Sequence, residues 1–230
     1  MDVGNSVRKA IDDFGDGEID AAMLHACNAV DGTAARVYPA ITGSNERFTT
    51  LLRENYDILG PMGAPGINLV ETRFPVQVDK PKAPGGQPDI ADIIYGIHRC
   101  HHGHGEALPG GFELMPDAAG TPGYTRMSLA KVGEGWRVRL SDRIIFGLLA
   151  VAVLSPANTG QQVPDGYHFT FGRKPVRLEI KGWWGRAADF PSVAALEPMP
   201  LVTFDFTEQL KELSPARSPT RQTRSRSRRR

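Results

Sequence analysis

The chain has 230 residues, of which 40% are hydrophobic and 23% are charged, which is enough for one globular domain with an ordinary core. The formal net charge of +1 conceals an asymmetry: residues 214–230 hold seven of the 27 basic residues and none of the 26 acidic ones, so residues 1–213 carry about −6. The two cysteines, Cys27 and Cys100, argue against a disulfide framework and favour a reducing compartment. The first residues show no apolar signal core, so we expect a cytoplasmic protein.

The first hundred residues are predicted to be helical apart from one long loop. Apolar residues at helical spacing predict helices over residues 6–14, 18–38, 44–59 and 89–103. Gly15, Pro39 and the pair Gly60-Pro61 are expected to end the first three helices. Ser44 or Asn45 is expected to cap the third and Asp89 the fourth. Residues 60–88 are rich in glycine and proline, which predicts a loop with one extended piece over 68–78.

The second half of the chain adds strands to this helical pattern. Alternating residues predict hairpins over 127–140, turning at residues 133–135, and over 168–181. Ser141 is expected to cap an apolar helix over 142–154; its apolar run is too short for a membrane span, which needs about 20 residues, so we expect no membrane contact. A short strand over 201–206 and a brief helix to residue 213 are expected to follow. The predicted fold class is therefore mainly α: one helical domain over 1–213 with small β-hairpin additions, α+β overall.

A histidine cluster follows the fourth predicted helix. Residues 97–106 hold four of the six histidines of the chain, together with Arg99, Cys100 and Glu106. Imidazole is the usual proton shuttle near neutral pH and the commonest metal ligand. The cluster is therefore the strongest candidate for a chemical site.

The pattern of Arg99-Cys100 followed by His104, and then by Gly105-Glu106-Ala107-Leu108-Pro109, resembles the signature of HEPN-type ribonucleases. Residues 29–34 and 48–52 are also similar to prokaryotic relatives of that superfamily, so the resemblance covers about residues 18–155. It implies a dimeric helical bundle and a metal-independent endoribonuclease that needs no cofactor. Such proteins serve in defence or toxin–antitoxin systems, which implies an inhibitory protein partner besides the RNA.

Carried over from that resemblance, Arg99 binds the scissile phosphate, and His104 is the general base or acid for attack by the ribose 2′-hydroxyl. A planar guanidinium suits the phosphate because it is always charged and donates two parallel hydrogen bonds. On a straight helix, positions 99 and 104 lie about 140° apart, so the helix must unwind near Gly103 or a partner chain must complete the site. His102 is the neighbour that a regular helix brings to Arg99, and Glu106 stands where the family often has a glutamate, displaced by one residue.

Three other interpretations stay open. Histidine and arginine are favoured at helix C-termini, where they complement the helix dipole. His98 and His102, or His101 and His104, have the spacing of zinc ligands, and His25, Cys27 and Asp31 are possible additional ligands, although we assign no metal. A catalytically inactive RNA-binding or scaffold module of the same fold is the third. Trp183 and Trp184 are expected in the core rather than as base-stacking residues.

The C-terminal segment 214–230 is rich in Ser, Arg and Pro and is expected to be disordered. Positive charge without acidic neighbours attracts phosphates in a salt-dependent manner, although the segment also has the acidic body of its own chain to contact. We therefore predict that it contacts RNA through Arg217, Arg221, Arg224, Arg226, Arg228, Arg229 and Arg230.

Overall fold

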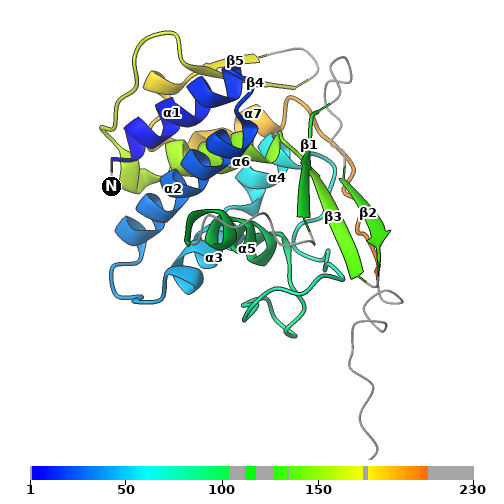
Figure 1. The fold of residues 1–230 in the computed structure, drawn as a ribbon. Helices are drawn as coiled ribbons and strands as arrows, with labels where there is room; N and C mark the ends of the chain where they lie inside the picture. Colours follow the sequence, from blue (N-terminus) through cyan, green and yellow to red (C-terminus); the bar gives the residue numbers. More distant parts are fainter. Residues whose placement is uncertain (1, 104–111, 118–126, 134, 173–175, 207–230) are drawn as a thin grey trace, which may run out of the picture.

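The computed structural model describes residues 2–103, 112–117, 127–133, 135–172 and 176–206. Six helices form most of the molecule, and two small sheets lie at its margins (Figure 1). The helices are α1 (Val3–Gly15), α2 (Ile19–Val37), α3 (Ser44–Glu54), α4 (Tyr56–Gly63), α5 (Ile90–Gly103) and α6 (Ile144–Leu154), with a short α7 (Phe190–Ala194) after them. The mixed α+β class predicted from the sequence is confirmed.

Helix α6 is the centre of the core. All but one of its 11 residues are buried, as its continuous apolar run predicts, and it packs against α1, α2 and α4. The approach to α4 is close because two glycines face each other: a Cβ built on Gly147 lies 2.8 Å from the Cα of Gly63. Asn158 follows in a 3₁₀ turn (Pro156–Asn158) and is fully buried. Its side-chain amide donates to Thr33 Oγ1 and to the carbonyl of Ala152, both at 2.7 Å, and so fastens α2 to the end of α6.

The third predicted helix is in fact two helices, so the expectation that Gly60-Pro61 ends it was wrong. The helix is interrupted at Asn55, and α4 then continues through Pro61 to Gly63. A proline costs helical stability because it lacks the N–H donor, but α4 is held by burial of Ile58, Leu59 and Met62. Gly43 rather than Ser44 or Asn45 occupies the N-cap position of α3, and no side chain caps that helix.

Residues 64–89 form the expected long loop, but they contain no strand. The extended piece predicted over 68–78 forms no strand, and the strand predicted over 201–206 is reduced to one isolated parallel bridge, between Ile67 and Val202. The backbone groups of Gly66 and Asn68 bond to the two sides of Val202. Residues 207–213, predicted as a helix, lie outside the described residues.

Both predicted hairpins are confirmed. Strands β2 (Met127–Val132) and β3 (Gly135–Ser141) pair antiparallel, and β4 (His168–Phe171) pairs antiparallel with β5 (Val176–Glu179). The sequence did not predict β1 (Phe112–Met115), which adds to β3 in parallel and gives a sheet of order β1-β3-β2. Within the described part of the chain, no helix is both long and apolar enough to cross a membrane.

Candidate functional site at the end of helix α5

A buried ionic network fixes the beginning of α5. Arg53 of α3 donates two hydrogen bonds to Asp89, at 2.7 and 2.9 Å, and also lies 2.9 Å from Asp92. The two carboxylates are 3% and 1% exposed. Asp89 accepts the N–H of Asp92, so it is the N-cap that the sequence predicts. The first turn of α5 is therefore tied to α3 by charge-assisted bonds.

The same network holds the loop that precedes α5. Asp92 accepts the backbone N–H groups of Lys82 and Ala83 at 2.8 and 2.9 Å, and the hydroxyl of Tyr56 donates to Asp89 at 3.0 Å. Burial pushes the pKa of Asp89 upward, but the hydrogen bonds and charge of Arg53 outweigh it and hold that pKa below its usual range. Burial and the neighbouring Asp89 raise the pKa of Tyr56. At neutral pH the Asp89 carboxylate is therefore ionised, and the Tyr56 hydroxyl keeps the proton that it donates.

The predicted catalytic residues lie at the other end of α5. Arg99 and His102 belong to its last turns, while His104 and Glu106 lie outside the described residues. The seven arginines of residues 217–230 lie outside them too. The helix continues to Gly103, so positions 99 and 102 have the i, i+3 relation of a regular helix.

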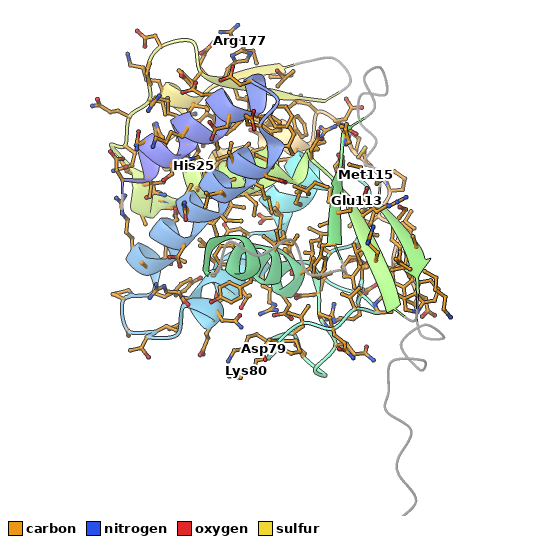
Figure 2. The ribbon with its side chains drawn as sticks, viewed as in Figure 1. His25, Asp79, Lys80, Glu113, Met115 and Arg177 are labelled. Carbon is orange, nitrogen blue, oxygen red and sulfur yellow. The ribbon has the colours of Figure 1, made fainter. Side chains whose placement is uncertain are left out.

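A pocket of about 460 Å³ with mixed polar and apolar lining meets α5 one turn before Arg99. Tyr95 and Gly96 contribute the wall from α5, and the start of α3 and the loop residues Asp79 and Lys80 face them. Figure 2 places those two loop residues beneath the helices. The hydroxyls of Tyr95 and Ser44 are 2.9 Å apart, which joins α5 to the first turn of α3. Ser44 therefore serves this contact instead of the capping role that the sequence suggests.

Uncompensated polar atoms gather on the first turn of α3. Asn45 lines this pocket, and its buried side-chain oxygen accepts no hydrogen bond from the residues that the structure describes. Arg47 and Asp31 approach each other only to 3.6 Å, and the buried Arg47 Nε has no hydrogen-bond partner among the same residues. Buried polar groups are normally satisfied, so these unpaired atoms distinguish the first turn of α3 from most of the described core. The sequence analysis missed Asn45 in this role because its pattern indicated only a cap.

Of the alternative constellations, the histidine pairs His98/His102 and His101/His104 lie outside the side chains that the structure describes. Cys27 is fully buried, which raises the pKa of its thiol, and His25 lies 3.6 Å from Asp13. No group of three metal-ligating side chains occurs among the side chains that the structure describes. Trp184 belongs to the core, as expected, and the exposed face of Trp183 is covered by Arg186, whose guanidinium carbon lies 4.7 Å from the ring centre.

The protein is thus an α+β domain. Its candidate site lies at the C-terminal end of α5, and the buried ionic network anchors the N-terminal end of the same helix. The chain belongs to the Rv1289 family, whose model matches residues 2–210. It is 38% identical over 207 residues to the uncharacterized proteins Rv1289 of Mycobacterium tuberculosis and Mb1320 of Mycobacterium bovis, and the alignment covers 90% of this chain and 94% of each relative. No solved structure matches the chain. The arginine-rich segment 214–230 lies beyond the residues matched by the family model.

Proposed function

We propose that this protein is a metal-independent endoribonuclease of the HEPN type that works as a homodimer. Arg99 binds the scissile phosphate, and His104 transfers the proton, with His102 and Glu106 as further residues of the site. The observation that carries the proposal is the pocket on α5: it is lined by Tyr95 and Gly96, four and three positions before Arg99. Positions separated by three and four residues share one face of a helix, so position 99 continues the face that the pocket opens on.

The pocket has the composition of a nucleotide subsite. Tyr95 and Phe112 supply aromatic surface, and Ser44 and Asn45 supply polar side chains to the lining. Proteins that recognise single-stranded RNA combine aromatic stacking with hydrogen bonds to the edges of splayed bases. Its volume of about 460 Å³ falls within the range of about 300–1,000 Å³ typical of ligand pockets. When a base occupies this pocket, the phosphate of that nucleotide lies near the last turns of α5.

The chemistry needs no metal because RNA carries its own nucleophile. A general base removes the proton of the 2′-hydroxyl, the 2′-oxygen attacks the adjacent phosphorus, and the bond from phosphorus to the 5′-oxygen breaks. The leaving oxygen takes a proton from a general acid. The products are a 2′,3′-cyclic phosphate and a 5′-hydroxyl. A guanidinium at the phosphate stabilises the extra negative charge of the transition state, and an imidazole suits the proton transfers at neutral pH.

The test is cleavage of labelled RNA by the purified protein in excess EDTA. Wild type is expected to leave 2′,3′-cyclic phosphate ends, and Arg99→Ala and His104→Ala are each expected to lose at least a hundredfold in rate. Arg177→Ala and His25→Ala are matched controls, since Arg177 is half-exposed on β5 and His25 lies on α2. Cleavage that survives both site variants, or that requires a divalent metal, contradicts the proposal.

A chain lacking residues 214–230 separates cleavage from RNA binding. If the arginines of this segment bind RNA electrostatically, its removal weakens RNA retention and flattens the salt dependence of binding. Cleavage of short RNA at saturating protein is expected to persist. Retention without any cleavage, abolished by the deletion, favours the inactive RNA-binding module instead.

A further inference from the structure

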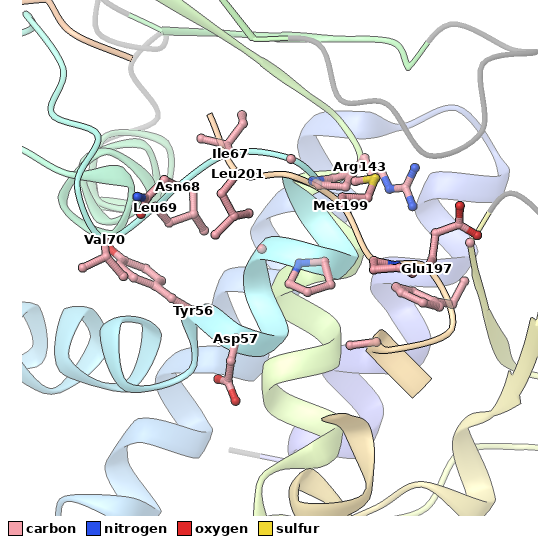
Figure 3. Close-up of a pocket in the computed structure, with 18 residues that line it drawn as sticks. Tyr56, Asp57, Ile67, Asn68, Leu69, Val70, Arg143, Glu197, Met199 and Leu201 are labelled. Carbon is pink, nitrogen blue, oxygen red and sulfur yellow. The ribbon is translucent and has the colours of Figure 1, made fainter. Parts of the chain in front are cut away.

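A second cavity lies between α4, the loop that follows it and the segment 197–201 (Figure 3). Its volume is about 350 Å³, at the small end of the range of about 300–1,000 Å³ for ligand pockets. Its lining is mainly apolar and includes Pro61, Pro65, Ile67, Leu69, Phe171 and Met199. The cavity shares no lining residue with the pocket on α5.

The mouth of this cavity exposes large apolar side chains. Val70 is 64% exposed and Leu201 is 65% exposed, and both line the cavity. They stand on the two segments joined by the bridge between Ile67 and Val202, where Asn68 N–H donates to Val202 and Val202 N–H donates to Gly66. An apolar mouth on an apolar cavity indicates a binding site for an apolar molecule.

Most polar groups around the cavity already have partners or point elsewhere. The hydroxyl of Tyr56 donates to Asp89, and the side-chain amide of Asn68 donates to Glu71 and Thr203. Figure 3 shows the carboxylate of Asp57 directed away from Arg143. Arg143 is therefore the polar group best placed to bind a ligand at this cavity.

Arg143 carries a poorly compensated positive charge. It precedes α6, and its side chain is 16% exposed. Within the described part of the chain its guanidinium makes one hydrogen bond, from Nε to the carbonyl of Met62 at 3.2 Å, and its nearest carboxylate, that of Asp117, is 4.0 Å away. Burial lowers the pKa of Arg143 despite that carboxylate. A guanidinium with donors to spare favours a carboxylate, which accepts two parallel hydrogen bonds.

We propose that this cavity binds a small organic acid, with its carboxylate on Arg143 and its apolar body against the loop and α4. The ligand carries a single negative charge, because Asp117 and Asp142, which line the neighbouring cavity together with Arg143, disfavour further negative charge there. The size of the cavity selects a medium-length aliphatic or a single-ring aromatic body.

The test compares three molecules with one apolar body and different head groups, by isothermal titration calorimetry on the full chain. Octanoate is expected to bind at least tenfold more tightly than octanol, since a hydrogen bond to a charged group contributes enough for that factor. Octylamine is expected not to bind, because its ammonium faces the guanidinium. Equal binding of octanoate and octanol, or no binding by any of the three, overturns the proposal.

Two variants locate the site. Arg143→Met keeps an apolar stem and is expected to weaken octanoate at least tenfold while leaving octanol unchanged. Gly60→Leu fills the cavity, since a Cβ on Gly60 meets nothing closer than Leu69 Cδ1 at 3.8 Å, and it is expected to block both ligands without loss of the thermal unfolding midpoint. Octanoate affinity that is unchanged in Arg143→Met and in Gly60→Leu overturns the assignment, and the unfolding midpoint shows whether each variant is folded.

Discussion

Replacing Arg53 by methionine is expected to destabilise the fold by about 3–5 kcal/mol at pH 7, the cost of removing one partner of a buried ion pair. Methionine keeps most of the apolar stem, so the change removes charge and hydrogen bonds rather than volume. It leaves Asp89 and Asp92, which are 3% and 1% exposed, without their cation. Their remaining partners are backbone N–H groups and the hydroxyl of Tyr56, which satisfy the oxygens but supply no compensating charge.

The pH dependence of this loss separates a charge effect from a packing effect. In the wild type the pKa of Asp89 lies below its ordinary value, so its contribution is complete above an unfolded pKa of about 3.9 and is lost as the pH falls through the folded pKa. Without Arg53, burial raises the pKa of Asp89, so ionisation then opposes folding. The destabilisation is therefore largest near neutral pH and shrinks as the pH falls toward 4.

Urea-induced unfolding of both proteins at pH 7 and at pH 4.5 measures this difference. Arg186→Met is a matched control, because its ion pair with Asp189 is about half-exposed on each side and such pairs contribute about 0–1 kcal/mol. A loss below about 1 kcal/mol for Arg53→Met, or a loss that is the same at both pH values, refutes the argument that a desolvated charge pair holds α5.

Three further substitutions and one control, Gly15→Ala, test the packing and the buried polar groups by the same unfolding measurement. Gly147→Ala is expected to cost about 1–3 kcal/mol, because its Cβ falls 2.8 Å from Gly63 Cα, whereas Gly15→Ala, whose Cβ meets nothing within 4 Å, is expected to be neutral or stabilising. Asp142→Asn is expected to stabilise the protein at pH 7, because burial raises the pKa of this carboxyl and its ionisation costs stability; the gain should vanish below about pH 4, where the acid is protonated in both states. Asn158→Ala is expected to cost about 2–4 kcal/mol, since it leaves buried polar groups unpaired; a cost below about 1 kcal/mol contradicts that account.

Local patterns were sufficient for the helices that bury one continuous face. The isoleucines of α5 recur at helical spacing behind Asp89, whose short carboxylate is suited to an N-cap, and both predictions hold. The apolar run of α6 predicts burial on all sides, and that is where the helix lies. The hairpins follow from alternation and their turn residues, which act over only a few positions.

The features that the sequence could not predict depend on distant partners. Strand β1 pairs in parallel with β3 across 26 residues, and nothing in four residues of extended chain specifies that neighbour. Arg53 meets Asp89 across 36 residues. After the break at Asn55, α4 packs Leu59 and Gly63 closely against α6, a contact with a helix about 80 residues further along the chain. Both cavities are lined by segments that come together only in the folded chain.

The position of the ionic network bears directly on the proposed nuclease site. A buried ion pair is a poor source of stability compared with apolar packing, and its best-attested role is to select one register. Arg53 contacts two carboxylates on the first turn of α5, so it fixes the rotation of that helix about its axis. One residue of slip rotates a helix by about 100° and would turn positions 95, 96 and 99 together away from the pocket. Arg53 lies on α3 and does not line the pocket. We nevertheless expect Arg53→Met, assayed under conditions in which the variant is fully folded, to lose RNA cleavage as Arg99→Ala does.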